Sequence, residues 1–342
     1  MTTLTAAFAE LAAAVRQASA EVGRPVTVDP AAVADRRDAL ELRPPGLWSP
    51  NRSCRLVRAA DGWIAVNLPR ASDLADVPAW LCATVSGDPW RAIGAIAAHT
   101  PRQALIDQAR LLGLPIAAVG EVRAASPLPP LVRFAPGAAG RGGGAQVLDL
   151  SGLWAGPLCG ALLAQAGFAV TKLESHRRPD VMADSAPGFF RRLNGEKRLA
   201  ALDFTDPADV ARLSAMIDAA DVLITSARPR AFEQLGLSPA AIFARNPGLV
   251  WVAISGYGWT GEASDRVAFG DDAAAAGGLV RWTSRGEPRF IGDALADPLT
   301  GLAAAAGAFA ALRAGGGLLV DAAMTRTAAG VAATMAAARA GA

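Results

Sequence analysis

The chain is poor in the residues that build metal centres, disulfide frameworks and hydrolase triads. Its 342 residues include only two histidines and three cysteines. The cysteines, Cys54, Cys82 and Cys159, are widely spaced, as is typical of reduced core residues and not of a disulfide framework or a zinc site. Because there is no Gly-x-Ser-x-Gly elbow either, a zinc enzyme and a Ser-His-Asp hydrolase are both disfavoured, and we expect no bound metal.

The sequence also lacks an imbalance of charge and long apolar segments. The net charge is only +2, so no general electrostatic argument favours a nucleic acid or an anionic membrane as partner. The apolar tracts at 303–311 and 318–324 are too short to cross a bilayer. Residues 4–20 have the pattern of an amphipathic Ala-rich helix and not of a signal peptide. We therefore expect a cytoplasmic protein with no membrane or nucleic-acid partner.

The first third of the chain combines a helical start with a hairpin signal. An Asp61-Gly62 pair separates two alternating runs at 54–58 and 63–68, which is the strongest short-range indication of a β-hairpin. Helical patterns follow at 73–85 and 101–112. These features predict a small α+β domain over residues 1–125.

Residues 126–145 are rich in Pro, Gly and Ala and include Arg141-Gly142-Gly143-Gly144. Such a composition predicts a flexible linker and hence a domain boundary. A glycine-rich loop could instead bind phosphate. No Lys-Ser/Thr follows these glycines, however, and they precede a strand, whereas a P-loop follows one.

From residue 146 to 342 the pattern changes to alternating strands and helices. Strands are predicted near 147–150, 169–173, 200–202, 222–225, 249–255 and 318–322. Near-continuous apolar strands joined by helices indicate an α/β fold, a Rossmann-like doubly wound parallel sheet covered on both faces. Ligands bind beyond the carboxyl ends of such strands. No Gly-x-Gly-x-x-Gly follows the first strand, so a nicotinamide or flavin dinucleotide is not indicated.

The side chains that could carry chemistry are mostly carboxylates. Asp297-Pro298 precedes a long Ala-rich run, which predicts that Asp297 is the N-cap of a buried helix. Capping alone would explain this residue, but a carboxylate held at a helix N-terminus can also attack a thioester, since the helix dipole favours the anion. His176, Arg177 and Arg178 follow the second predicted strand, where they would meet a phosphate-bearing ligand or form a solvated loop.

Several motifs in this order resemble the large domain of the class III CoA-transferases, the formyl-CoA and carnitine-CoA transferase type. The matching stretches are Val-Leu-Asp-Leu-Ser-x-x-x-Ala-Gly-Pro at 147–157, Gly-Phe-Ala-Val-Thr-Lys-Leu-Glu at 167–174, Asn194-x-x-Lys197-Arg198, Ser-Gly-Tyr-Gly-x-x-Gly at 255–261 and Ala296-Asp297-x-x-x-Gly301. Each motif is weak alone, but their number and order are specific.

The resemblance implies that Asp297 is the nucleophile and that coenzyme A is bound over the strand ends. In this family the Asp attacks an acyl-CoA to give a mixed anhydride, which CoA then converts into an aspartyl-CoA thioester for transfer to a carboxylic acid. The positions implied in CoA binding are Trp154, Ala155, Ser175, His176, Arg177, Lys197, Leu202, Ser226, Ala227, Arg228, Gln234 and Arg266.

The order of domains differs from that of the family, in which the small domain follows the large one, because the small domain comes first here. We therefore expect a permuted or rearranged member, and a homodimer that is interlocked as in the family or paired without threading. One alternative is an α-methylacyl-CoA racemase, which needs a second base. Related racemases have a His where this chain has Phe269-Gly270-Asp271, so racemisation is disfavoured. The other alternative is a catalytically inactive CoA-binding protein.

Overall fold

The structure is a computed structural model that describes residues 3–138 and 144–340. The chain folds into two compact units, each made of segments that are separate in the sequence. Unit 1 falls within Met1–Leu40, Leu128–Asp265 and Pro298–Ala323, and unit 2 within Glu41–Pro127, Arg266–Asp297 and Met324–Ala342.

Unit 1 is built on a sheet that has seven strands among the described residues. They are β4 (Leu131–Arg133), β5 (Gln146–Leu150), β6 (Ala169–Ser175), β7 (Arg198–Leu202), β8 (Val222–Thr225), β9 (Val250–Ser255) and β12 (Leu318–Ala323). The spatial order is β4-β12-β9-β8-β5-β6-β7, and every pairing is parallel except that of β4 with β12. The prediction of a doubly wound parallel sheet is confirmed. Its strand order reverses between β5 and β8, where such sheets bind ligands beyond the carboxyl ends.

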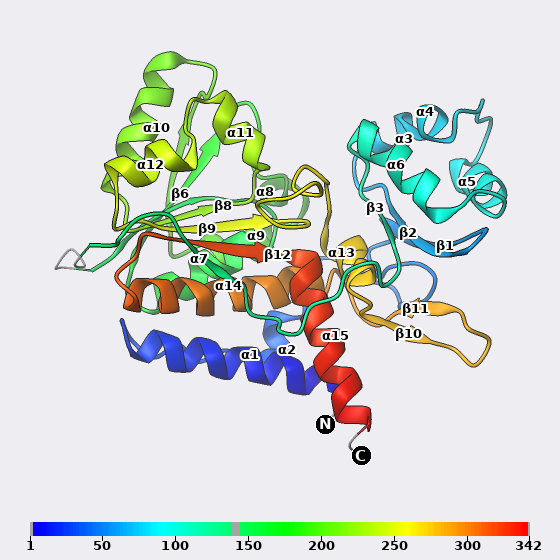
Figure 1. Cartoon of the computed structure of the whole chain (residues 1–342), viewed down its shortest axis with the longest axis horizontal. Helices are drawn as coiled ribbons and strands as arrows, with labels where there is room; N and C mark the ends of the chain where they lie inside the picture. Colours follow the sequence, from blue (N-terminus) through cyan, green and yellow to red (C-terminus); the bar gives the residue numbers. More distant parts are fainter. Residues whose placement is uncertain (1–2, 139–143, 341–342) are drawn as a thin grey trace. The chain divides into compact units, whose positions relative to one another are not determined.

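Helices cover both faces of this sheet (Figure 1). They are α1 (Thr3–Ala20), α2 (Pro30–Val33), α7 (Ala155–Gln165), α8 (Met182–Ser185), α9 (Pro187–Asn194), α10 (Pro207–Ala219), α11 (Pro229–Gln234), α12 (Pro239–Arg245) and α14 (Ala296–Arg313), the last belonging to unit 1 from Pro298 onward. The face under α10, α11 and α12 has a core that includes Leu213, Phe232 and Trp251. On the other face α14 packs closely on α7, because a Cβ at Gly301 would lie 2.7 Å from Leu158 Cδ2.

Unit 2 is a small α+β structure. Its strands are β1 (Cys54–Ala59), β2 (Gly62–Asn67), β3 (Ile116–Ala118), β10 (Val280–Trp282) and β11 (Pro288–Phe290), and its helices are α3 (Ala71–Ala75), α4 (Val77–Leu81), α5 (Pro89–Ala97), α6 (Arg102–Leu112), α13 (Gly270–Ala276) and α15 (Met324–Ala340). The β1–β2 pairing across Asp61-Gly62 confirms the predicted hairpin. Ile64, Val66, Trp80, Ile93 and Leu105 belong to the core that its helices form with this sheet.

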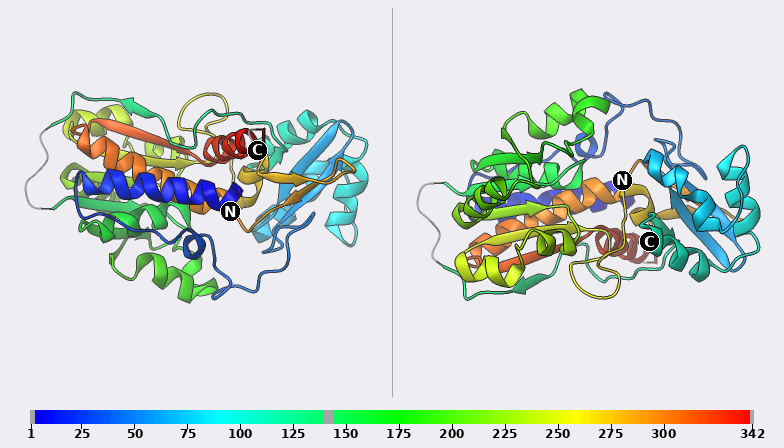
Figure 2. Two further views of the ribbon diagram at one scale, coloured as in Figure 1. Left: turned by 90° about the horizontal axis from the view of Figure 1, so that it is seen from below. Right: turned by 90° about the horizontal axis from the view of Figure 1, so that it is seen from above.

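The first 40 residues belong to unit 1 and not to the small α+β unit in which the sequence placed them. Two polar contacts just after α1 join this segment to the rest of unit 1. Arg24 donates its backbone N–H to the Ala166 carbonyl at 3.0 Å, and Glu21 forms a 2.6 Å ion pair with Arg313 at the end of α14. Figure 2 shows α1 (blue) lying along α14 (orange). The amphipathic pattern of α1 did not reveal which surface it would cover.

The stretch expected to be a linker, 126–145, contains strand β4. β4 pairs with β12, the Pro130 carbonyl accepts a hydrogen bond from the Asp321 N–H at 3.1 Å, and Phe134 stacks on Phe243. Residues 139–143, which hold most of the predicted glycine loop, lie outside the described residues. The sequence signal failed because a three-residue strand among prolines has no visible period.

Two segments predicted to belong to the Rossmann-like domain instead fall in unit 2. These segments carry α13 and α15, which pack on each other so closely that a Cβ at Gly277 would lie 2.5 Å from the Ala329 nitrogen. Among the described residues, no helix has the length and apolar character needed to cross a membrane.

Candidate active site

A pocket of about 650 Å³ opens at the carboxyl ends of the central strands of unit 1. Its lining comes from the carboxyl ends of β5 and β6, from the loops after β5, β6 and β7, and from α11. The residues are Leu150, Ser151, Gly152, Leu153, Lys172, Leu173, Glu174, Ser175, Arg177, Arg178, Pro179, Asp180, Val181, Phe204, Thr205, Ala231, Gln234 and Leu235. The volume is that of an ordinary small-molecule or cofactor site, and the location is the one that the doubly wound topology predicts.

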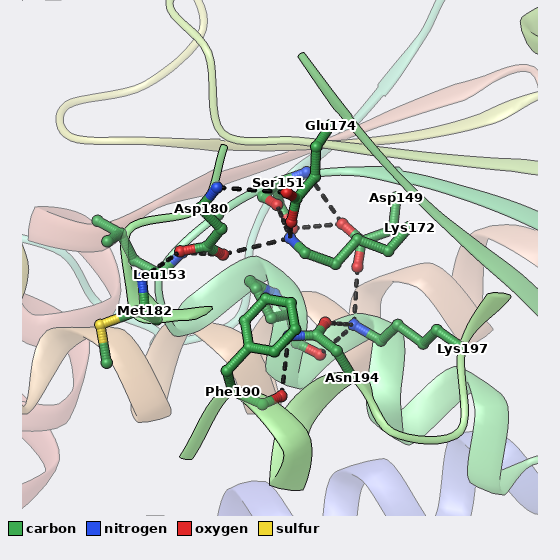
Figure 3. Close-up of polar contacts among 12 residues, drawn as sticks. Asp149, Ser151, Leu153, Lys172, Glu174, Asp180, Met182, Phe190, Asn194 and Lys197 are labelled. Carbon is green, nitrogen blue, oxygen red and sulfur yellow. Dashed lines mark hydrogen bonds and ion pairs between the residues drawn. The ribbon is translucent and has the colours of Figure 1, made fainter. Parts of the chain in front are cut away.

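The floor of the pocket is fixed by Lys172, which is fully buried in β6. Its ammonium group donates to the Ser151 carbonyl at 2.7 Å and to Asp180 Oδ2 at 3.2 Å (Figure 3). Asp180 Oδ2 also accepts the backbone N–H of Leu153, which has a φ of +67°. A non-glycine residue persists in this region only when its surroundings hold it. Lys172 and Asp180 therefore hold two loops of the pocket in one arrangement.

A second buried pair, Lys197 and Asp149, lies close to the first (Figure 3). Lys197 Nζ donates to Asp149 Oδ2 and the Pro157 carbonyl, each at 2.8 Å, and to Asn194 Oδ1 at 2.9 Å. Burial opposes ionisation of Asp149, but the charges of Lys197 and Lys172 outweigh it and lower the pKa of this carboxyl. Burial also lowers the pKa of Lys197, against the attraction of Asp149. Both side chains can remain ionised at neutral pH because each supplies the partner that the other needs.

The pocket brings together three of the side chains predicted to bind CoA, namely Ser175, Arg177 and Gln234. The others lie elsewhere. Trp154 is buried against Phe189 and under the Arg36 guanidinium, and the neighbouring Ala155 is also buried. Lys197 is part of the buried ion pair.

Six further predicted positions belong to loops, strand ends or unit 2. Leu202 is buried at the end of β7, and its carbonyl accepts the backbone N–H of the exposed His176. Ser226 accepts the Gly152 N–H at 3.1 Å, and Ala227 and Arg228 follow it as partly buried residues. Arg266 belongs to unit 2, where its guanidinium donates to Glu121 at 2.7 Å.

Asp297 lies in the first turn of α14 and in unit 2. The helix begins at Ala296, so Asp297 is one residue inside it and not the N-cap that the sequence predicted. Its side chain is partly exposed, and its backbone N–H donates to the Ala294 carbonyl at 2.9 Å. Its Oδ2 lies against Gly270, where an added Cβ would overlap that oxygen and approach the Ala294 carbonyl oxygen to 2.5 Å. The space beside this carboxylate therefore depends on glycine at position 270.

Three more carboxyl groups of unit 2, those of Asp271, Asp272 and Asp293, are buried. Asp272 Oδ1 accepts the Asn67 amide at 2.7 Å and the Phe269 N–H at 2.9 Å. Burial outweighs these bonds and raises the pKa of Asp272 to about 8, so this carboxyl is protonated at neutral pH. Within the described residues, no group of His, Cys, Asp and Glu side chains is arranged to hold a metal ion.

This raised pKa makes stability depend on pH. An unfolded chain releases the Asp272 proton near pH 4, whereas the folded protein keeps it up to about pH 8. The stabilisation from this proton is thus complete below pH 4 and is lost as the pH rises through that window, by on the order of 1 kcal/mol per pH unit. We expect Asp272→Asn to remove this slope in urea denaturation series. An unchanged slope would mean that Asp272 is ionised in the folded protein.

Sequence reasoning missed Lys172, Asp180 and Gly270 as residues that shape these sites. A signal existed for Lys172, because a lysine in an apolar central strand must be buried and therefore paired. No sequence signal identified its partner Asp180, which is eight residues away across a loop.

Comparisons with known proteins relate this chain to CoA-transferases. Residues 143–342 match CoA-transferase family III. Succinyl-CoA--D-citramalate CoA-transferase of Chloroflexus aurantiacus is 32% identical over 189 residues, which cover 52% of this chain and 47% of that protein. Succinyl-CoA:glutarate CoA-transferase of Mus musculus is 30% identical over 191 residues, covering 52% and 44%.

Solved structures show the same likeness. The crystal structure of Rv3272 from M. tuberculosis matches with a TM-score of 0.53 and 28% identity, over 61% of this chain and 59% of that one. The chain spans about half the length of the curated relatives it matches.

Proposed function

The chain belongs to CoA-transferase family III, and we propose that it moves CoA from an acyl-CoA to a carboxylic acid with Asp297 as nucleophile. The observation that carries this proposal is the Asp297 carboxylate itself, partly exposed in the first turn of a long helix and bordered by a glycine. The positive end of the helix dipole stabilises a carboxylate there. The relatives named above as CoA-transferases support the same reaction.

The pocket of unit 1 supports CoA as the ligand. Arg177 and Arg178 line its mouth as exposed cations, and guanidinium groups bind phosphates well. Ser175, Thr205 and Gln234 add neutral hydrogen-bonding groups, and Phe204 adds an apolar surface. These are the kinds of side chain that a phosphorylated nucleotide with a pantetheine arm requires.

The reaction that we propose proceeds by acyl transfer to and from the carboxylate. An Asp297 oxygen attacks the thioester carbonyl, the C–S bond breaks, and CoA leaves as the thiolate. That thiolate attacks the Asp297 carbonyl of the mixed anhydride, which releases the first carboxylate and forms an aspartyl-CoA thioester. The acceptor carboxylate attacks this thioester, which forms a new mixed anhydride and frees the CoA thiolate. The thiolate then attacks the acceptor carbonyl of that anhydride, and the new acyl-CoA and free Asp297 result.

The test is a screen of acyl-CoA and carboxylic acid pairs, read by mass spectrometry of the CoA esters. We expect one or more new acyl-CoA products that require both substrates. Loss of deuterium from the α-carbon of a single acyl-CoA, with no transfer, would indicate a racemase instead. Tight CoA binding with neither reaction would indicate a binding protein.

Gly270→Ala should lower kcat strongly. The added methyl group would overlap Asp297 Oδ2 and move it, and a displacement of about 1 Å at a reacting atom costs on the order of 10²-fold. KM for the acyl-CoA should change little. The control is Gly94→Ala in α5, where an added Cβ meets no atom within 4 Å. Equal kcat in both variants would contradict the assignment of Asp297.

The family resemblance also predicts a homodimer, and the composition and N-terminal pattern of the sequence predict a cytoplasmic location. Light scattering of the purified protein tests the first, and a fluorescent fusion of the whole protein tests the second. A monomer that transfers CoA would show that the dimer is not needed for the reaction.

A further inference from the structure

The side chain of Asn51 joins two distant parts of unit 2. Its Nδ2 donates to Asp271 Oδ2 at 2.8 Å and to Asp293 Oδ1 at 2.9 Å, although these residues are 220 and 242 positions away. Its Oδ1 accepts the Ser53 N–H at 2.8 Å and the Ser49 hydroxyl at 2.9 Å. Every hydrogen-bonding atom of the amide is therefore used, and its orientation is fixed from both ends.

A chain of hydrogen bonds leads from Asn51 to the start of α14. Asp271 Oδ1 accepts the backbone N–H of Ala294 at 2.8 Å, and the Ala294 carbonyl accepts the N–H of Asp297 at 2.9 Å. Ala294 has a φ of +43°, in the left-handed region. An alanine there is strained by on the order of 1–2 kcal/mol and keeps that conformation only when neighbouring groups enforce it.

We propose that Asn51 is a positioning residue for the reaction, which holds the Ala294–Asp297 turn through the buried carboxylates Asp271 and Asp293. This inference rests on the proposed function, since it concerns the orientation of the Asp297 carboxylate. Asn51 does not touch the reacting atoms. It acts by fixing Asp271, which in turn fixes the strained residue whose carbonyl closes the turn.

The place that Asn51 occupies calls for a hydrogen-bond donor. Asp271 and Asp293 are 2% and 7% exposed, so each needs donors when ionised. One amide NH₂ group supplies a hydrogen to each. The charged and titratable groups near it include Asp271, Asp293, the exposed Arg52 and the buried thiol of Cys54, whose pKa is raised by burial and further by the charges of Asp271 and Asp272. A third carboxylate here would therefore be repelled.

The first test compares Asn51→Ser with Asn246→Ser. Asn246 is a control in unit 1, because its amide also donates two hydrogen bonds, to the Ile217 and Ala220 carbonyls, and it is buried where Asn51 is partly buried. Both variants should lose thermal stability. Only Asn51→Ser should lower kcat, by about 10- to 100-fold with KM for the acyl-CoA nearly unchanged, as expected of a displaced nucleophile. Equal kcat in the two variants would make Asn51 merely structural and the proposal wrong.

The second test uses Asn51→Asp and the pH profile. The new carboxyl would take up a proton at lower pH and so restore one donor. The ratio of variant to wild-type kcat should therefore rise several-fold as the pH falls from 8 to 6, and a flat ratio would contradict the proposal.

Trapping with hydroxylamine distinguishes a failure of the proposed function from a failure of the role of Asn51. Wild-type protein that is never marked at Asp297 refutes the proposed function, whereas equal rates of marking in wild type and Asn51→Ser refute only the role of Asn51.

Discussion

Asp297→Asn is expected to abolish CoA transfer, with kcat reduced by about 10⁴-fold or more, as when other covalent nucleophiles are removed. An amide has nearly the shape of a carboxylate but does not attack a thioester. The helix start should survive, because the interaction of one charge with the helix dipole contributes only about 0.3–1 kcal/mol. CoA affinity should be retained, since the pocket of unit 1 that we propose for CoA is unchanged.

The measurement combines steady-state kinetics with covalent trapping. Protein incubated with an acyl-CoA and hydroxylamine should acquire a hydroxamate at Asp297 in wild type and none in Asp297→Asn. The matched control is Asp107→Asn, which removes an exposed carboxylate of α6 in the same unit and should be marked like wild type. If Asp297→Asn unfolds, Asp297 is a structural residue of the helix start and the enzymatic assignment loses its support.

Lys197→Met should reduce the free energy of unfolding of unit 1 by about 3–5 kcal/mol, the usual cost of removing one member of a buried ion pair. Asp149 is fully buried and would keep only its bonds from Ser151 and the charge of Lys172. The Pro157 carbonyl and Asn194 Oδ1 would lose a donor as well. Urea denaturation followed by circular dichroism measures the loss.

The double variant Asp149→Leu with Lys197→Met is the control. Replacing both members of a buried pair by apolar groups is often close to neutral, so this variant should recover most of the lost stability. A pH series adds a check with a definite sign. Because the pKa of Asp149 is lowered in the folded protein, its stabilisation is present above pH 4 and is lost as the pH falls further. If Lys197→Met instead raised KM for CoA and left stability unchanged, Lys197 would contact CoA as the sequence predicted.

The parts of the fold that could be predicted from sequence are those with a local period or a local turn. The apolar runs of β5, β6, β8 and β9 and the helices between them indicated a parallel sheet, and Asp61-Gly62 indicated the β1–β2 hairpin; all are confirmed. The start of α14 was predicted within one residue, because Asp-Pro and the alanines after it act over a single turn.

Membership of the two units could not be predicted in the same way. The helix α1 and the short strand β4 join the sheet of unit 1 through partners far away in the sequence, and α15 joins unit 2. Amphipathic character shows that a helix will bury one face, but it does not specify the surface that covers that face.

The residues of the candidate site also divide into those that local sequence indicated and those that only the fold revealed. Motifs of contiguous residues indicated Asp297 and the strand ends, and these stand as predictions supported by family membership. The buried partners became visible only when the chain was folded, because Lys172 finds Asp180 across a loop and Asn51 finds Asp271 at a separation of 220 residues. Local structure depends on interactions between neighbouring residues, and the sequence therefore reveals it. The pairing of buried charges depends on which surfaces meet in the folded protein, and the spacing of residues along the chain does not encode that.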